Sequence, residues 1–186
     1  VGLGHDLVEA PFTYDVEAPF LTWTLIGADG SVTGGPTVID GVDQGYMIHD
    51  CTITERYLVF LISPIIPDGI PIALGLSSFG DGMKYRPERG SSFVLIPRDG
   101  GDIRRIEHDA VLQFHLSNAF DDRGDVVLDA VTYHDGELLE CIARFRTSPL
   151  DRAISEFTRF RITAAGRVIR EQISDERRIA RPARGG

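Results

Sequence analysis

Short runs of β-forming residues, each closed by a turn, recur along this 186-residue chain and constrain its fold more than any other feature. Twenty glycines and ten prolines are scattered through the chain without a period, which is typical of frequent turns. Because no convincing helix interrupts the units, the sequence predicts an all-β fold: a sandwich, a barrel or a propeller. Periodicity alone does not choose among the three. The runs lie at residues 21–26, 51–62, 92–96, 126–133 and 157–163.

The composition predicts one domain, spanning residues 1–186, because 42% of the residues are hydrophobic and the length supports one core. The formal net charge is -9, and it is unevenly spread. Residues 1–50 carry eight Asp and Glu without a Lys or Arg, whereas residues 151–186 carry nine Arg against five acidic residues. Nucleic acid is not an expected partner, since phosphate binding requires a clustered basic surface. The Arg-rich tail, residues 174–186, is expected to be disordered.

The two cysteines predict the redox setting. Cys51 and Cys141 lie far apart, and their neighbours are apolar or β-branched. We expect reduced core thiols rather than a disulfide, which favours a cytoplasmic location. No stretch approaches the roughly 20 apolar residues that span a bilayer. The sequence therefore predicts a soluble protein that at most touches a membrane surface.

One apolar segment, residues 61–76, breaks the β pattern. Its prolines at 64, 67 and 71 argue against a regular helix and against a central strand. Two interpretations remain open: a loop packed over the core, or an exposed apolar lip that admits an apolar substrate or contacts lipid.

His49 and His115 are the histidines in apolar surroundings, each at the edge of an expected strand. On the residues alone, a structural role is favoured over metal binding for both. They lie 66 residues apart, so a shared metal would require the fold to bring them together. Neutral imidazole suits Fe, Cu, Ni and Zn alike, so the pair does not identify the ion. His108 and His134 lie in charged or turn-forming sequence and are expected to face solvent.

Several segments, in the right order, resemble motifs of the carotenoid cleavage oxygenase family, which includes lignostilbene dioxygenases. The string YMIHDCTITERYLVF at 46–60 is similar to the family's MMHDFAITENYVVF, and FHLSNAFDD at 114–122 is similar to its FHxxNAYED. Three further segments, at 12–23, 92–98 and 126–133, agree as well. The resemblance is strongest over residues 10–135.

The resemblance implies a partial seven-bladed β-propeller of the carotenoid oxygenase type. It implies an Fe(II) ion on four histidines, of which His49 and His115 match two, and no other catalytic residue is assigned. The implied reaction is cleavage of a conjugated double bond of a carotenoid, apocarotenoid or stilbenoid by O2, giving carbonyl products. His5 matches neither remaining ligand, and Glu176 is a weak match to a glutamate that orients a ligand.

An alternative from a different class is a truncated or degenerate β-propeller module without metal or catalysis. Two matched ligands are few for a stable iron site, and 186 residues supply only about half of the blades at about 40–45 residues each. Metal analysis distinguishes the two hypotheses.

Overall fold

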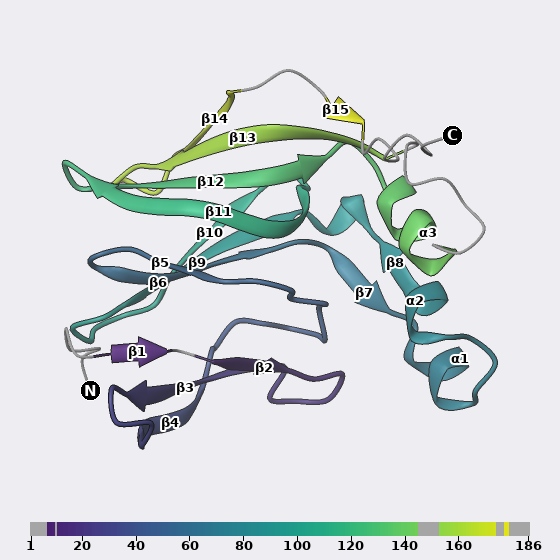
Figure 1. The fold of residues 1–186 in the computed structure, drawn as a ribbon, viewed down its shortest axis with the longest axis horizontal. Coiled ribbons are helices and arrows are strands. Elements are labelled where there is room, and N and C mark those ends of the chain that lie inside the picture. The colour runs from purple at the N-terminus through teal and green to yellow at the C-terminus, as the bar shows by residue number, and fades with distance from the viewer. Residues whose placement is uncertain (1–6, 10, 145–152, 174–176, 179–186) are drawn as a thin grey trace, which may run out of the picture.

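A computed structural model describes residues 7–9, 11–144, 153–173 and 177–178. Within these ranges the chain is built mainly of β-strands, with three short α-helices (Figure 1). The predicted all-β class is confirmed. Three larger sheets follow one another along the sequence and lie side by side, and the helices gather at one end of the stack. A fourth sheet is a two-stranded antiparallel pair, Ile65–Pro67 with Met83–Tyr85.

The first sheet is centred on β3 (Leu21–Gly27). It pairs antiparallel with β1 (Leu7–Glu9) and β2 (Phe12–Tyr14) on one side and with β4 (Val32–Val38) on the other. The expected β-run at 21–26 is therefore confirmed, and the turn that closes it joins β3 to β4 in a hairpin. Its turn places Gly30 at a φ of 78°, a conformation that glycine adopts without steric cost.

The second sheet has the order β5, β6, β9, β10, all antiparallel. These strands are β5 (Thr52–Ile53), β6 (Tyr57–Ile62), β9 (Ser91–Pro97) and β10 (Arg104–His108). Between β6 and β9 the chain leaves the sheet and forms β7 (Ile65–Pro67), α1 (Gly69–Ala73), α2 (Phe79–Gly82), β8 (Met83–Tyr85) and the 3₁₀ turn η1 (Pro87–Arg89).

The segment at 61–76 differs from its prediction in two respects. Leu61 and Ile62 complete the central strand β6, because the first proline follows only at position 64. The helix α1 contains Pro71. Proline is tolerated there because it lies in the first helical turn, where backbone N–H groups lack intrahelical acceptors.

The third sheet has the order β11 (Leu112–Asp122), β12 (Asp125–Tyr133), β13 (Ile154–Ile162), β14 (Val168–Gln172). A short strand, β15 (Arg177–Arg178), also pairs with β13. After β12 the expected turn leads instead into the helix α3 (Glu137–Ala143), which buries Leu138, Leu139 and Cys141. This helix is not predicted from the sequence, because seven residues are too few to establish a helical period.

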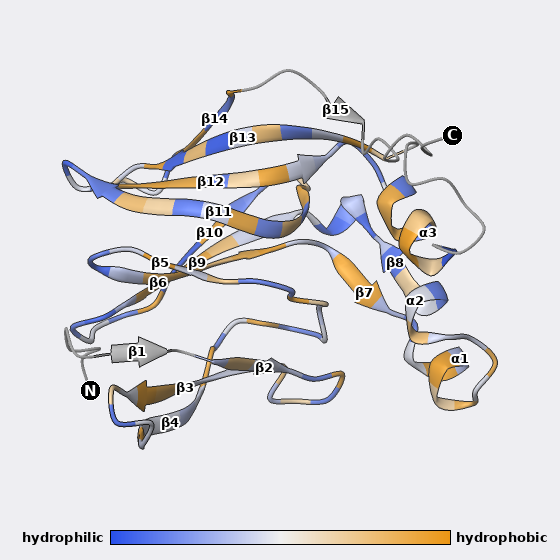
Figure 2. Cartoon of the chain, in the orientation of Figure 1, coloured by the Kyte–Doolittle hydropathy of each residue, from blue (hydrophilic) through white to orange (hydrophobic). Residues whose placement is uncertain are grey.

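The second sheet is the central layer, and it is buried on both faces. In β6, Leu58, Phe60 and Ile62 pack toward the first sheet, whereas Val59 and Leu61 pack toward the third. This alternation follows from the two-residue period of a strand. Figure 2 shows the resulting concentration of hydrophobic residues in β6, β9 and β12.

Some expectations fall outside the described residues: the positions of His5 and Glu176, and the disorder of most of the tail at 174–186. The predicted single domain over 1–186 also stays a prediction. Among the described residues, no helix has the length and apolar character needed to cross a membrane.

Candidate metal centre

His49 ends an extended segment that leads from the first sheet to β5. Tyr46 and Ile48 are buried in the core between the first two sheets. The Met47 N–H donates to the Ile65 carbonyl at 2.8 Å, which fixes this segment against β7. Since the buried residues alternate along an extended chain, His49 points away from that core and is exposed.

His115 lies on β11, the strand at the edge of the third sheet. Around it the pairing of β11 with β12 shifts register, first between Gln113 and Leu116 and again between Leu116 and Asn118. Such irregularities redirect side chains locally. Phe114 is buried, while His115 is exposed.

The fold brings the two histidines together. The ring centroids of His49 and His115 are 4.8 Å apart, and the ring planes meet at 87°. Phe114 packs against the His49 ring at a centroid distance of 5.3 Å. Two side chains separated by 66 residues therefore form one pair, one from the segment that precedes β5 and one from β11 of the third sheet.

The pair has the chemistry of a metal-binding site. Each metal–imidazole bond is about 2.1 Å long, so rings this close can reach one ion. No hydrogen bond from another described residue occupies the nitrogens of either ring. Neutral imidazole nitrogens suit Fe(II). The two rings thus fit half of a four-histidine set, while the described residues contain no group of three or more His, Cys, Asp or Glu able to hold a metal.

Asp50 joins the backbones beside the two histidines. Its Oδ1 accepts the N–H of Cys51 at 2.9 Å, and its Oδ2 accepts the N–H of Leu116 at 3.0 Å. Burial raises the pKa of the Cys51 thiol to about 11, and the Asp50 carboxylate adds to this effect. The described residues hold no group of three or more His, Cys, Asp or Glu that could bind one ion, so Cys51 does not extend the histidine pair.

The other described histidines and cysteines do not join the pair. His108 was expected to face solvent, but it is half-buried, with its ring 5.8 Å from that of Phe93 and 5.9 Å from that of Phe160. That prediction is wrong, because β10 directs His108 onto the core of the central sheet. His134 is exposed, with Nε2 3.5 Å from Glu156 Oε2. Cys51 and Cys141 are both free, and Cys141 is buried.

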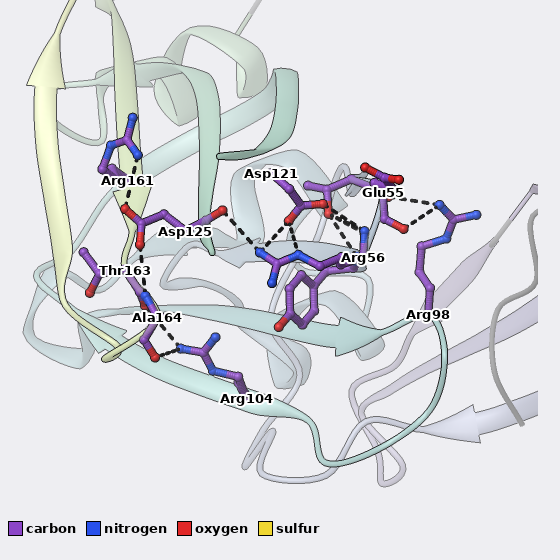
Figure 3. Close-up of polar contacts among 11 residues, drawn as sticks. Glu55, Arg56, Arg98, Arg104, Asp121, Asp125, Arg161, Thr163 and Ala164 are labelled. Carbon is purple, nitrogen blue, oxygen red and sulfur yellow. Dashed lines mark hydrogen bonds and ion pairs between the residues drawn. The ribbon is translucent and has the colours of Figure 1, made fainter. Parts of the chain in front are cut away.

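A polar network joins the central and third sheets through their turns (Figure 3). Asp121 accepts the Arg56 N–H at 2.9 Å and the Arg56 Nε–H at 3.0 Å. Asp125 accepts the Ala164 N–H at 3.1 Å and binds Arg161 at 3.2 Å. Neither Asp121 nor Asp50 has a role that is predicted from the sequence, although both lie within the motif strings that carry the resemblance.

The segment at 61–76 carries exposed apolar side chains beyond β7. Ile70 is 75% exposed, Leu74 66% and Leu76 78%. The neighbouring Phe79 is 53% exposed. The segment therefore has features of both interpretations. Ile65 packs into the core, as expected for a packed loop, while α1 and the residues after it present exposed apolar side chains.

Comparison with protein families identifies what the chain is similar to. The family model described as retinal pigment epithelial membrane protein matches residues 10–182. The apocarotenoid-15,15'-oxygenase of Synechocystis is 32% identical over 127 residues, which cover 68% of this chain and 26% of that protein. The zeaxanthin 7,8(7',8')-cleavage dioxygenase of Crocus sativus is 26% identical over 78% of this chain and 36% of that protein.

Solved structures of the Synechocystis enzyme are also similar to this chain in fold. A variant of the Synechocystis apocarotenoid oxygenase superposes with a TM-score of 0.70 at 27% identity, covering 88% of this chain and 34% of that one. The cobalt-substituted Synechocystis enzyme gives a TM-score of 0.67 at 29% identity, covering 82% of this chain and 32% of that one. The chain thus spans about a quarter to a third of the length of these relatives.

Proposed function

Because the chain belongs to the retinal pigment epithelial membrane protein family, that of the carotenoid-cleaving oxygenases, we propose that the protein carrying it is a non-haem Fe(II) oxygenase. Its substrate is a carotenoid, apocarotenoid or stilbenoid, and O2 cleaves a conjugated carbon–carbon double bond to give carbonyl products. The family resemblance drawn from the motif strings is confirmed, and with it the partial β-propeller fold.

The observation that carries the proposal is the His49–His115 pair, with ring centroids 4.8 Å apart. In this proposal the two imidazoles would hold the ion, and the iron would supply the activation of O2 when it is bound. Phe114 restricts the orientation of the His49 ring from the side. The proposal is supported by the way the segment before β5 and the edge strand β11 present their imidazoles to one point.

Metal analysis and oxygen consumption test this function in the protein of native length that carries the chain. We expect about one Fe per chain and O2 uptake with an apocarotenoid or a stilbene. His49→Ala and His115→Ala should lose both, while His134→Ala, an exposed histidine away from the pair, should keep both. Full iron content and activity in His49→Ala would contradict the assignment.

The alternative is a degenerate propeller module without metal. It is favoured by one observation, that the described residues offer only the histidine pair and no larger ligand group. The same measurement decides between the two functions. Wild-type protein that is free of iron after anaerobic loading with Fe(II) supports the degenerate module.

We further propose that the apolar surface formed by Ile70, Leu74 and Leu76 contacts a lipid bilayer. Its support is the exposure of these side chains, since contiguous apolar surface usually marks a binding region. Cosedimentation with phosphatidylcholine vesicles tests it. The double variant Leu74→Asp with Leu76→Asp should lose vesicle binding, and the double variant with Met at both positions should retain it. Equal binding by the two would contradict this contact.

For the cellular location we propose the cytoplasm. Free cysteines are the usual state in a reducing compartment, and Cys51 and Cys141 are both free. Cell fractionation with compartment markers tests the location, and recovery in an oxidising compartment would contradict it.

A further inference from the structure

The histidine pair depends on two strands that do not pair with each other. β5, which follows His49, pairs with β6, and β11, which carries His115, pairs with β12. In the described part of the chain no ladder of backbone hydrogen bonds joins β5 to β11. Other contacts must therefore set the position of one imidazole relative to the other.

Asp50 makes such a contact beside both histidines. Asp50 directly follows His49 in the sequence. Its carboxylate accepts the N–H of Cys51, the next residue, at 2.9 Å, and the N–H of Leu116, which directly follows His115, at 3.0 Å. Each oxygen of the carboxylate takes one backbone donor. Hydrogen bonds to an ionised acceptor are shorter and about twice as strong as neutral ones.

The backbone of β11 makes the Leu116 donor available. A strand that is paired on one side directs alternate N–H groups toward its open edge. The register of β11 shifts on both sides of Leu116. A half-buried N–H at this edge needs an acceptor, and Asp50 supplies it from the neighbouring sheet.

We propose that Asp50 is a positioning residue, which locks the backbones of His49 and His115 together so that both imidazoles face one metal ion. The inference rests on the proposed function. Asp50 touches neither ring nitrogen in the described structure and acts through the two peptide N–H groups. Aspartate suits this role better than asparagine, because two accepting oxygens are required and asparagine replaces one of them with an NH2 group, which only donates.

The structure offers a matched control in Asp121. Its carboxylate also accepts a backbone N–H from the neighbouring sheet, that of Arg56 at 2.9 Å. Asp121 lies six residues beyond His115 on the same strand, β11. Asp121→Asn therefore weakens a bond of the same kind, together with the ion pair to the Arg56 side chain, in the same strand but away from the histidines.

The experiment compares Asp50→Asn and Asp121→Asn in the protein of native length. Co(II) titration, followed by the visible d–d spectrum, reports metal affinity and ligand geometry without any turnover. We expect Asp50→Asn to weaken Co(II) binding about 10-fold or more and to shift the spectrum. Asp121→Asn should leave both unchanged, although urea denaturation should show a loss of stability in both variants.

A second variant tests the role if Asp50→Asn does not fold. Replacing Leu116 by its α-hydroxy acid exchanges the N–H for an ester oxygen and leaves Asp50 intact. The same loss of Co(II) affinity is expected. Wild-type affinity in Asp50→Asn or in this ester variant would overturn the positioning role alone, as would an equal loss in Asp121→Asn. A wild-type protein that binds no metal would overturn the proposed function as well.

Discussion

Phe60 and Leu61 are neighbours on β6, both without exposed surface, yet they belong to different hydrophobic cores. Phe60 packs toward the first sheet and Leu61 toward the third. The central sheet therefore packs against both outer sheets. A substitution in one of its side chains disturbs the core shared with the outer sheet that this side chain contacts. The histidine pair straddles one of these two interfaces, between the central and third sheets.

The first prediction concerns the core between the central and third sheets. Phe93 has no exposed surface, and its ring lies 5.3 Å from that of Phe160. Phe93→Ala should lower the free energy of unfolding by about 3–5 kcal/mol, because the cavity removes both burial and packing. Phe79→Ala, at a residue that is 53% exposed, should change it by less than about 0.5 kcal/mol. Urea denaturation measures both, and similar values would contradict the layered core.

Much of this architecture could be predicted from the sequence. The run YLVFLI at 57–62 is hydrophobic without alternation, which is typical of a strand buried on both faces, and β6 has this property. A Gly- and Asp-containing turn, typical of a hairpin, lies at Asp29 and Gly30 between β3 and β4. The meeting of His49 with His115 was implied by the family resemblance, because no local spacing connects residues so far apart.

Other features depend on tertiary context. The helix α3 has only seven residues, and its burial against Ile65 and Met83 supplies what its length does not. A proline disrupts a helix only when it lies beyond the first turn, and Pro71 lies within the first turn of α1. His108 reads as a polar position in a charged strand, but the aromatic rings that cover it come from β9 and β13. Sequence periodicity holds no information about such distant partners.

The second prediction concerns pH and the carboxylate of Glu156. Its side chain is 9% exposed, forms an ion pair with Arg170 and accepts the Thr158 hydroxyl at 3.2 Å. Burial raises the pKa of this carboxyl, but the hydrogen bond and charge of Arg170, with Thr158 and His134, outweigh burial and lower it below 4.5. A carboxyl with a lowered pKa stabilises the fold above its unfolded-state pKa. That stability is lost as the pH falls through the folded-state pKa.

Urea denaturation between pH 7 and pH 3 tests this linkage. Glu156→Gln should unfold more easily than wild type at pH 7, by about 1–3 kcal/mol, since it loses a charged hydrogen bond. The difference should shrink below about pH 4.5, as the wild-type carboxyl becomes protonated. Glu171→Gln, at an exposed residue of β14, should follow the wild-type profile. A difference between Glu156→Gln and wild type that stays constant with pH would contradict the role of the charge.

The third prediction concerns the segment that leads to His49. Gly45 is buried, and a Cβ built on it would lie 2.6 Å from the Asp15 carbonyl oxygen and 2.8 Å from the Val16 Cα. Both atoms belong to the backbone, so one of the two chain segments must move to admit a methyl group. Gly45→Ala should cost about 1–3 kcal/mol of stability and, because His49 lies four residues along, should also weaken Co(II) binding.

Gly69→Ala is the control, since its Cβ would meet nothing within 4 Å. Urea denaturation and Co(II) titration measure the two effects separately. Lost stability with unchanged Co(II) affinity would show that the metal site is independent of this close approach, and unchanged stability would show that the contact itself is relieved without cost.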